Sequence, residues 1–254
     1  MKSTETFEYS GTIELINTEN YLKKYNTWIA KLLIMPLQCK GWSSQKTISS
    51  GKITHVMDFG AGIGTISKIT KKLRPDFYLH AVEPDENLHN FNPKTSQMYQ
   101  SLADIPEKLQ MDFVFSSNVL EHIPDDVSAI KNIAKKMKKG ATFSIYVPAM
   151  KLLWSPMDDH VEHHRRYTFQ TLSEAICSAG LKPIKIKYVD SSGALLTLFY
   201  KIINKFRRQT KNYTRPSVTA LNIYDKLICP LNNLTDILFG HKFGKNLIAY
   251  CIKE

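Results

Sequence analysis

Short apolar runs alternate with amphipathic stretches along most of the chain. Strand-length apolar runs occupy residues 53–59, 77–82, 112–116, 141–147, 184–189 and 247–252, with a weaker candidate at 96–102. Helical patterns lie between them at 66–73, at 127–137 with a stop at Gly140, and at 169–179 with a stop at Gly180. This alternation predicts a mainly parallel sheet with helices on both faces.

The N-terminal part has a different pattern. Apolar residues such as Leu22, Tyr25, Trp28 and Leu32 have the spacing of an amphipathic helix, predicted over 21–37 and ended by Pro36. Residues 41–51 are rich in Ser, Thr and Gly and predict a loop. We therefore expect a helical segment ahead of the first strand.

Composition and charge narrow the class of protein. The 254 residues are 43% hydrophobic and 22% charged, which is typical of one folded α/β domain. The net charge of +11 (34 − 23) favours anionic partners such as nucleic acid, phosphorylated metabolites or anionic lipid. Six basic residues and no acidic ones lie within 201–215, after the apolar run 195–200. This segment is either a membrane-surface patch or a solvated helix and loop.

The cysteines and the N-terminus bear on the compartment. The four cysteines form no C-x-x-C pair, so they predict neither a disulfide framework nor a zinc site. The first six residues are polar, unlike a signal peptide, and the apolar run at 194–200 is too short to span a bilayer. We expect a cytoplasmic protein that could still touch a membrane surface.

The strongest local motif is Val-Met-Asp-Phe-Gly-Ala-Gly-Ile-Gly-Thr at 56–65, where a strand enters a glycine-rich turn. Glycines permit such a turn and let a ligand approach the backbone. The spacing differs from the G-x-G-x-x-G of dinucleotide sites, because the third glycine is Gly64 and Thr65 takes the last place. A nucleotide-like ligand is also indicated by Glu83, since an acid at the end of the second strand can bind both ribose hydroxyls.

Two further segments offer acid–base groups. Asn118, Glu121 and His122 follow the strand at 112–116, whose tip should line a ligand crevice. The alternative is that Glu121 and His122 lie at the start of a helix and only bond to nearby backbone groups. The loop 153–168 carries three histidines in five residues, but no second ligand cluster is evident elsewhere, so we predict no metal site. In the same loop Arg165 and Arg166 either grip an anionic acceptor or form an internal ion-pair network.

These motifs together resemble one group of the class I S-adenosylmethionine-dependent methyltransferases. The group carries Tyr-Asn-x-Trp, Gly-x-Gly-Ile-Gly, Asn-Val-Leu-Glu-His-Ile, Val-Pro-Ala and His-x-Arg-Arg-Tyr, which stand here at 25–28, 60–64, 118–123, 147–149 and 163–167. The resemblance runs from about Tyr21 to the C-terminus. Two positions depart from it: Glu162 stands where glycine is usual, and Asp190 where asparagine is usual.

The resemblance implies one doubly wound α/β domain with a mostly parallel, seven-stranded, Rossmann-like sheet. Residues 1–50 would form a helical cap, 51–190 the cofactor-binding core, and 191–254 a helical insertion and the last strand. The implied cofactor is S-adenosylmethionine. Its site would comprise Tyr25, Asp58, Gly60, Gly62, Gly64, Glu83, Ser101, Leu102 and Asn118.

The resemblance also implies methyl transfer to oxygen or nitrogen of a small-molecule, glycan or lipid-linked acceptor. The candidate catalytic residues are His122, Asp159, His163 and Tyr167, and His160, Arg165 and Arg166 would bind the acceptor. Nucleic acid is not the expected partner, whereas an anionic membrane surface is a candidate. The alternatives are a nicotinamide-dependent oxidoreductase and a non-catalytic protein that binds nucleic acid or membrane.

Overall fold

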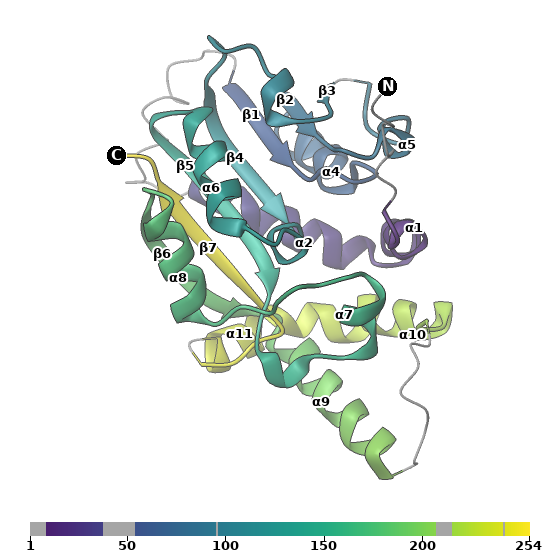
Figure 1. Cartoon of the computed structure of the whole chain (residues 1–254). Coiled ribbons are helices and arrows are strands. Elements are labelled where there is room, and N and C mark those ends of the chain that lie inside the picture. The colour runs from purple at the N-terminus through teal and green to yellow at the C-terminus, as the bar shows by residue number, and fades with distance from the viewer. Residues whose placement is uncertain (1–8, 38–53, 95, 207–214, 241) are drawn as a thin grey trace, which may run out of the picture.

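The computed structural model describes residues 9–37, 54–94, 96–206, 215–240 and 242–254 (Figure 1). Within these residues, seven strands form one sheet in the order β3-β2-β1-β4-β5-β7-β6. The strands are β1 (Thr54–Phe59), β2 (Phe77–Val82), β3 (Ser96–Tyr99), β4 (Met111–Ser117), β5 (Met137–Pro148), β6 (Lys182–Val189) and β7 (Asn246–Ile252). Only β7 runs antiparallel to its neighbours. The sheet confirms the predicted fold class.

Helices cover both faces of the sheet. The longer ones are α1 (Thr12–Tyr21), α2 (Lys23–Leu33), α4 (Thr65–Leu73), α6 (Asp126–Lys135), α8 (Phe169–Ser178), α9 (Ser191–Phe206) and α11 (Asn232–Phe239). The shorter ones are η1 (Met35–Leu37), α5 (Glu86–His89), η2 (Leu102–Asp104), η3 (Leu120–His122), η4 (Lys151–Leu153), α7 (Pro156–His160), α10 (Val218–Ile223), η5 (Tyr224–Ile228) and η6 (Cys229–Leu231).

Alternation along the strands divides the core into two layers. In β4, Phe113 and Phe115 pack with Ile29 and Leu33 of α2, whereas Val114 packs on the opposite face with the cluster formed by α6 and α8. Buried strands in the middle of such a sheet are apolar on both faces, which explains their continuous hydrophobic runs. Figure 1 shows α6 and α8 in front of the sheet and α2 behind it.

Several boundaries differ from the sequence prediction. The helix predicted at 127–137 ends at Lys135, and Met137 already belongs to β5. Gly140 does not stop a helix; it has φ +80° inside β5, where the pairing with β4 is irregular. The helix predicted at 21–37 begins only at Lys23, and α1, which was not predicted, precedes it. The predicted loop at 41–51 lies outside the described residues, as does most of the basic segment at 201–215.

The helices between β6 and β7 extend one end of the molecule. α9 projects away from the sheet, with α11 beside its base, whereas α10 lies beside α1 (Figure 1). Among the described residues, no helix is both long and apolar enough to cross a membrane.

Candidate functional site

The glycine loop joins β1 to α4 through three left-handed glycines. Gly60, Gly62 and Gly64 have φ of +78°, +53° and +75°. A Cβ at Gly60 would lie 2.2 Å from Val119 Cγ2, and one at Gly64 would lie 2.4 Å from Asn92 Oδ1, so packing requires glycine at both. At Gly62 the nearest atom is Leu15 Cδ1, at 3.2 Å. Gly62 is therefore the least crowded of the three glycines, since only the end of the Leu15 side chain approaches it.

A cavity of about 900 Å³ opens beside this loop, at the carboxyl ends of the parallel strands. Eight of the nine predicted donor residues line it, namely Tyr25, Asp58, Gly60, Gly62, Glu83, Ser101, Leu102 and Asn118. Gly64 does not, because its role is to pack against Asn92. Tyr9, Leu15 and Thr18 also line the cavity and were missed, since α1 has little hydrophobic periodicity.

Glu83 follows β2 and is fixed by the backbone on two sides. Its Oε2 accepts a hydrogen bond from the Gly62 amide at 2.7 Å, and its Oε1 accepts one from the Asp85 amide at 3.0 Å. Burial raises the pKa of this carboxyl above its usual value, while the two amides oppose the shift. The carboxylate thus couples the end of β2 to the glycine loop.

Asp58 near the end of β1 is almost completely buried. Its Oδ2 accepts a hydrogen bond of 2.8 Å from Ser67 Oγ. Burial raises the pKa of Asp58 to about 7, and Glu83 adds to the rise, although the Ser67 bond opposes it. A positively charged group of a bound ligand would stabilise the ionised form of Asp58.

Tyr25 lines the cavity, but its hydroxyl is held beneath it. The hydroxyl donates to Asp190 Oδ2 at 3.0 Å and lies 2.9 Å from Tyr146 Oη, while Tyr224 Oη donates to Asp190 Oδ1 at 2.7 Å. The Gly193 amide is a further donor to Asp190. Asp190, at one of the two departures from the family pattern, is therefore the acceptor at the centre of a buried tyrosine cluster.

The loop that follows β5 is closed at its base by the backbone. The Tyr167 amide donates to Pro148 O at 2.8 Å, and the Met150 amide donates to Tyr167 O at 3.0 Å. At its centre is Asp158, which the sequence analysis missed. This buried carboxylate accepts from Arg166 Nε and Nη2 at 2.8 and 3.1 Å, and from His163 Nδ1 at 2.8 Å. These donors hold the pKa of Asp158 well below its usual range against the effect of burial.

The other predicted residues of this loop are also bound within the protein. Arg165 pairs with Asp126 at 2.8 Å and donates to Pro124 O at 2.6 Å. Tyr167 is buried and its hydroxyl donates to Asp126 Oδ2 at 2.6 Å. Exposed Asp159 accepts from Trp154 Nε1, and His160 lies 3.3 Å from a carboxylate oxygen of Glu14. For the two arginines this geometry matches the internal network, the second of the two alternatives. None of these residues lines the cavity.

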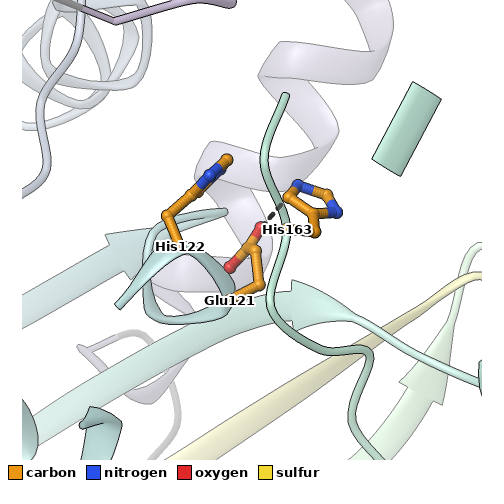
Figure 2. A group of neighbouring side chains, drawn as sticks. All are labelled: Glu121, His122 and His163. Carbon is orange, nitrogen blue, oxygen red and sulfur yellow. Dashed lines mark ion pairs between the residues drawn. The ribbon is translucent and has the colours of Figure 1, made fainter. Parts of the chain in front are cut away.

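His122 is the predicted catalytic residue that does line the cavity. Its ring contacts His163 edge-on at 4.6 Å between centroids and Tyr9 at 5.6 Å. Burial and the neighbouring His163 lower the pKa of His122 to about 4, so the ring is neutral at pH 7. Glu121 beside it is completely buried, and burial raises its pKa to about 8. Figure 2 shows the three side chains together. Glu121 Oε1 lies 3.8 Å from His163 Nε2.

Comparison with known proteins shows the family of the chain. A methyltransferase domain family model matches residues 41–186. The chain belongs to the methyltransferase domain family. This membership confirms the predicted methyltransferase, and with it the expectation of S-adenosylmethionine as methyl donor. The nicotinamide alternative is thereby set aside.

Solved structures show the same fold at low sequence identity. A chain of the complex between the Haloferax volcanii Trm112 methyltransferase activator and a methyltransferase is 14% identical, with a TM-score of 0.53, over 92% of this chain and 97% of that one. A SAM-dependent methyltransferase from Archaeoglobus fulgidus is 18% identical, with a TM-score of 0.52, over 83% and 92%. The plantazolicin methyltransferase BpumL, solved with S-adenosylhomocysteine, is 11% identical, with a TM-score of 0.56, over 95% and 90%. No curated protein sequence matches the chain.

Proposed function

We propose that this enzyme binds S-adenosylmethionine in the glycine-loop cavity and transfers its methyl group to an oxygen or nitrogen of a small-molecule, glycan or lipid-linked acceptor. The observation that carries the proposal is the convergence of Asp58, Gly62 and Glu83 on one cavity. Its volume of about 900 Å³ is large enough for a nucleoside-sized donor with an acceptor group beside it.

The residues present fit such a donor. Asp58 is a buried carboxyl that would hold the cationic amino end, and Gly62 leaves its backbone approachable. Glu83 would hold the ribose hydroxyls, with Ser101 and Leu102 beside the adenine. When bound, the donor supplies a methyl group already activated by the positive sulfur. The protein contributes mainly orientation, and α1 with Leu15 and Thr18 helps to exclude water.

On the acceptor side we assign His122 a direct role, because it is the candidate acid–base residue in the cavity lining. Its neutral ring can accept a hydrogen bond from the acceptor group and so position it, while a pKa of about 4 makes the ring a weak base. His163 lies behind it and acts through it. Arg165, Arg166 and Tyr167 serve to hold the loop in place. Arg166 and Tyr167 are bonded to Asp158 and Asp126, which lie outside the cavity lining. Arg165 is bonded to Asp126 and to the backbone carbonyl of Pro124.

Calorimetric titration with S-adenosylmethionine tests the donor site. We expect one bound equivalent, and an affinity about 1–3 kcal/mol weaker in Glu83→Gln, because one carboxylate bond is lost. The control is Glu86→Gln, an exposed acid three residues away, which should bind as the wild type does. Binding of a nicotinamide dinucleotide instead, or equal affinity in both folded variants, would contradict the proposal.

A specific surface feature favours a lipid-linked acceptor. Large apolar side chains of the C-terminal helices are exposed, including Phe199 at 62%, Leu227 at 64% and Ile237 at 79%. Exposed Lys226 and Lys242 lie in the same region of the chain, which as a whole carries a charge of +11. We propose that this end rests on an anionic membrane surface, since apolar burial and attraction to anionic lipid act together there.

Co-sedimentation with vesicles of phosphatidylserine and phosphatidylcholine tests this contact. We expect binding at low salt that weakens at physiological salt, and a clear loss of binding in the double variant Phe199→Ser, Ile237→Ser. Phe91→Ser removes an apolar residue that is 45% exposed in the segment after α5, and serves as the matched control. Absence of sedimentation at both salt concentrations would contradict the membrane contact and leave the donor site untouched.

A further inference from the structure

A carboxylate and two imidazoles from distant parts of the chain meet beside the cavity. Glu121 and His122 lie on η3, after β4, and His163 lies on the loop after β5 (Figure 2). One potential ligand atom from each residue lies within 4.8 Å of the other two. Metal–nitrogen and metal–oxygen bonds are about 2.0–2.2 Å long. Shifts of less than about 1 Å would therefore let all three atoms bind one ion.

The carboxyl group of Glu121 lacks hydrogen-bond partners. Glu121 is completely buried, and neither Oε1 nor Oε2 has a hydrogen-bond partner within the described residues. A buried carboxyl group normally accepts several hydrogen bonds or binds a cation, because its desolvation is costly. The two oxygens therefore mark the position where a cation would be stabilised.

The imidazole opposite is held in the orientation that metal coordination needs. His163 Nδ1 donates to the Asp158 carboxylate at 2.8 Å, and its Nε2 faces Glu121, so Nε2 is the ring nitrogen placed to bind an ion. Asp158 is itself fixed by Arg166. A carboxylate that orients a histidine from behind is the usual outer partner of a histidine ligand.

We propose that Glu121, His122 and His163 bind one divalent transition-metal ion. Two imidazole nitrogens and one carboxylate oxygen suit Zn²⁺, Mn²⁺, Fe²⁺, Co²⁺ or Ni²⁺ better than Mg²⁺ or Ca²⁺, which prefer oxygen ligands. With three protein ligands, at least one coordination position remains for water or another oxygen. The sequence offered no second cluster for the loop histidines, and the fold supplies it from η3.

The position of the site suggests its use, and this step rests on the proposed function. His122 lines the cavity, so an ion on its ring lies at the acceptor side of the wall. There it can lower the pKa of a bound hydroxyl group and replace a general base in the metal-loaded protein. In that state His122 is a ligand and no longer accepts a proton.

Metal binding is tested directly on the full chain without a histidine tag, stripped with a chelator and then titrated with Co²⁺ by visible absorption and with Zn²⁺ by calorimetry. We expect one equivalent to bind and to raise the melting temperature. Glu121→Gln and His163→Asn should each weaken binding at least tenfold. The control is His164→Ala, because His164 is an exposed histidine of the same loop.

The competing arrangement is a carboxylic acid at Glu121 that donates to His163 with no metal. It predicts no saturable Co²⁺ spectrum in the wild type, or equal affinities in the wild type and Glu121→Gln, and either result overturns the proposal. Circular dichroism of each variant checks that it is folded. Donor affinity is measured on the same metal-free samples, so a failure of the donor site is recognised separately.

Discussion

The glycine-loop side of the cavity and the loop after β5 are both dense in charged and polar residues, yet they use them in opposite ways. On the first side, Asp58 and Glu83 line a cavity, and only part of their bonding capacity is met by Ser67 and two amides. On the second, Asp158 binds Arg166 and His163, and these contacts lie outside the cavity lining. The polar groups of the first region face a cavity that can hold a ligand, whereas those of the second region bond to one another.

The difference teaches how to interpret a motif of charged residues. His-x-Arg-Arg-Tyr looks like an anion-binding loop, but its arginines and tyrosine bond to Asp158, Asp126 and backbone carbonyls. The motif therefore maintains the loop and orients His163. We therefore propose that acceptor recognition depends on other groups that line the cavity, among them Tyr9 and His122. The expectations below test this division, beginning with the largest effect.

Asp158→Ala should be the most damaging change. It leaves the buried Arg166 guanidinium and His163 without their acceptor, and removal of one partner of a buried ion pair costs about 3–5 kcal/mol of the free energy of unfolding. Denaturant unfolding gives the value. Asp159→Ala, the next residue and exposed, should cost less than about 1 kcal/mol. Similar losses in the two variants would mean that the loop is not organised around Asp158.

Gly60→Ala should act on the other region. The added Cβ meets Val119 at 2.2 Å and imposes a left-handed alanine, so we expect a loss of about 2–3 kcal/mol in stability together with weaker donor binding. Gly140→Ala is the matched control, because Gly140 also has a positive φ, but no described atom lies within 4 Å of a Cβ added there. It should show only the left-handed cost of about 1–2 kcal/mol and normal donor affinity. Equal effects of the two substitutions would show that the Val119 side chain moves aside at little cost in free energy.

Much of the fold and donor site follows from local sequence signals. Each strand run, the glycine loop and Glu83 is marked by a few neighbouring residues, because turn geometry and burial act locally. Helix α1 was missed because its apolar residues are not gathered on one face. Gly140 was misplaced because a glycine with positive φ ends a helix or forms a strand irregularity equally well.

The acceptor side depends on contacts that no local pattern reveals. Asp158 and Asp159 are adjacent and chemically identical, but only Asp158 lies inside the loop, where it accepts from Arg166. The Ser155-x-x-Asp158 capping box was the available signal. Likewise, Glu121 and His163 are about forty residues apart, and only the folded loop brings them together.

Asp58→Asn should give a smaller, pH-dependent effect. The pKa of Asp58 is raised from 3.8 to about 7 in the folded state, so its stability contribution is complete below about pH 4 and is lost as the pH rises through 7. The asparagine does not ionise. The variant should therefore gain stability over the wild type by about 2.6 kcal/mol more at pH 8 than at pH 5, while its donor affinity falls.

Thermal or denaturant unfolding at the two pH values measures this difference. Asp76→Asn is the control, because Arg74 lowers the pKa of Asp76 and reverses the sign of the pH dependence. A difference between Asp58→Asn and the wild type that does not change between pH 5 and pH 8 would place the Asp58 carboxyl in a polar, solvated setting.

Arg165→Ala should have the smallest effect on stability, and it distinguishes most directly between the two roles of the loop. Its partner Asp126 and the Pro124 carbonyl lie near the surface, and a partly exposed ion pair contributes about 0.2–1 kcal/mol. If Arg165 only braces the loop, this small loss of stability should come with an unchanged Michaelis constant for any acceptor found. Arg165→Lys keeps the charge but loses the forked geometry, so it separates the two roles. A large rise in the Michaelis constant in Arg165→Ala, restored by Arg165→Lys at unchanged stability, would return the loop to acceptor binding and remove the contrast between the two regions.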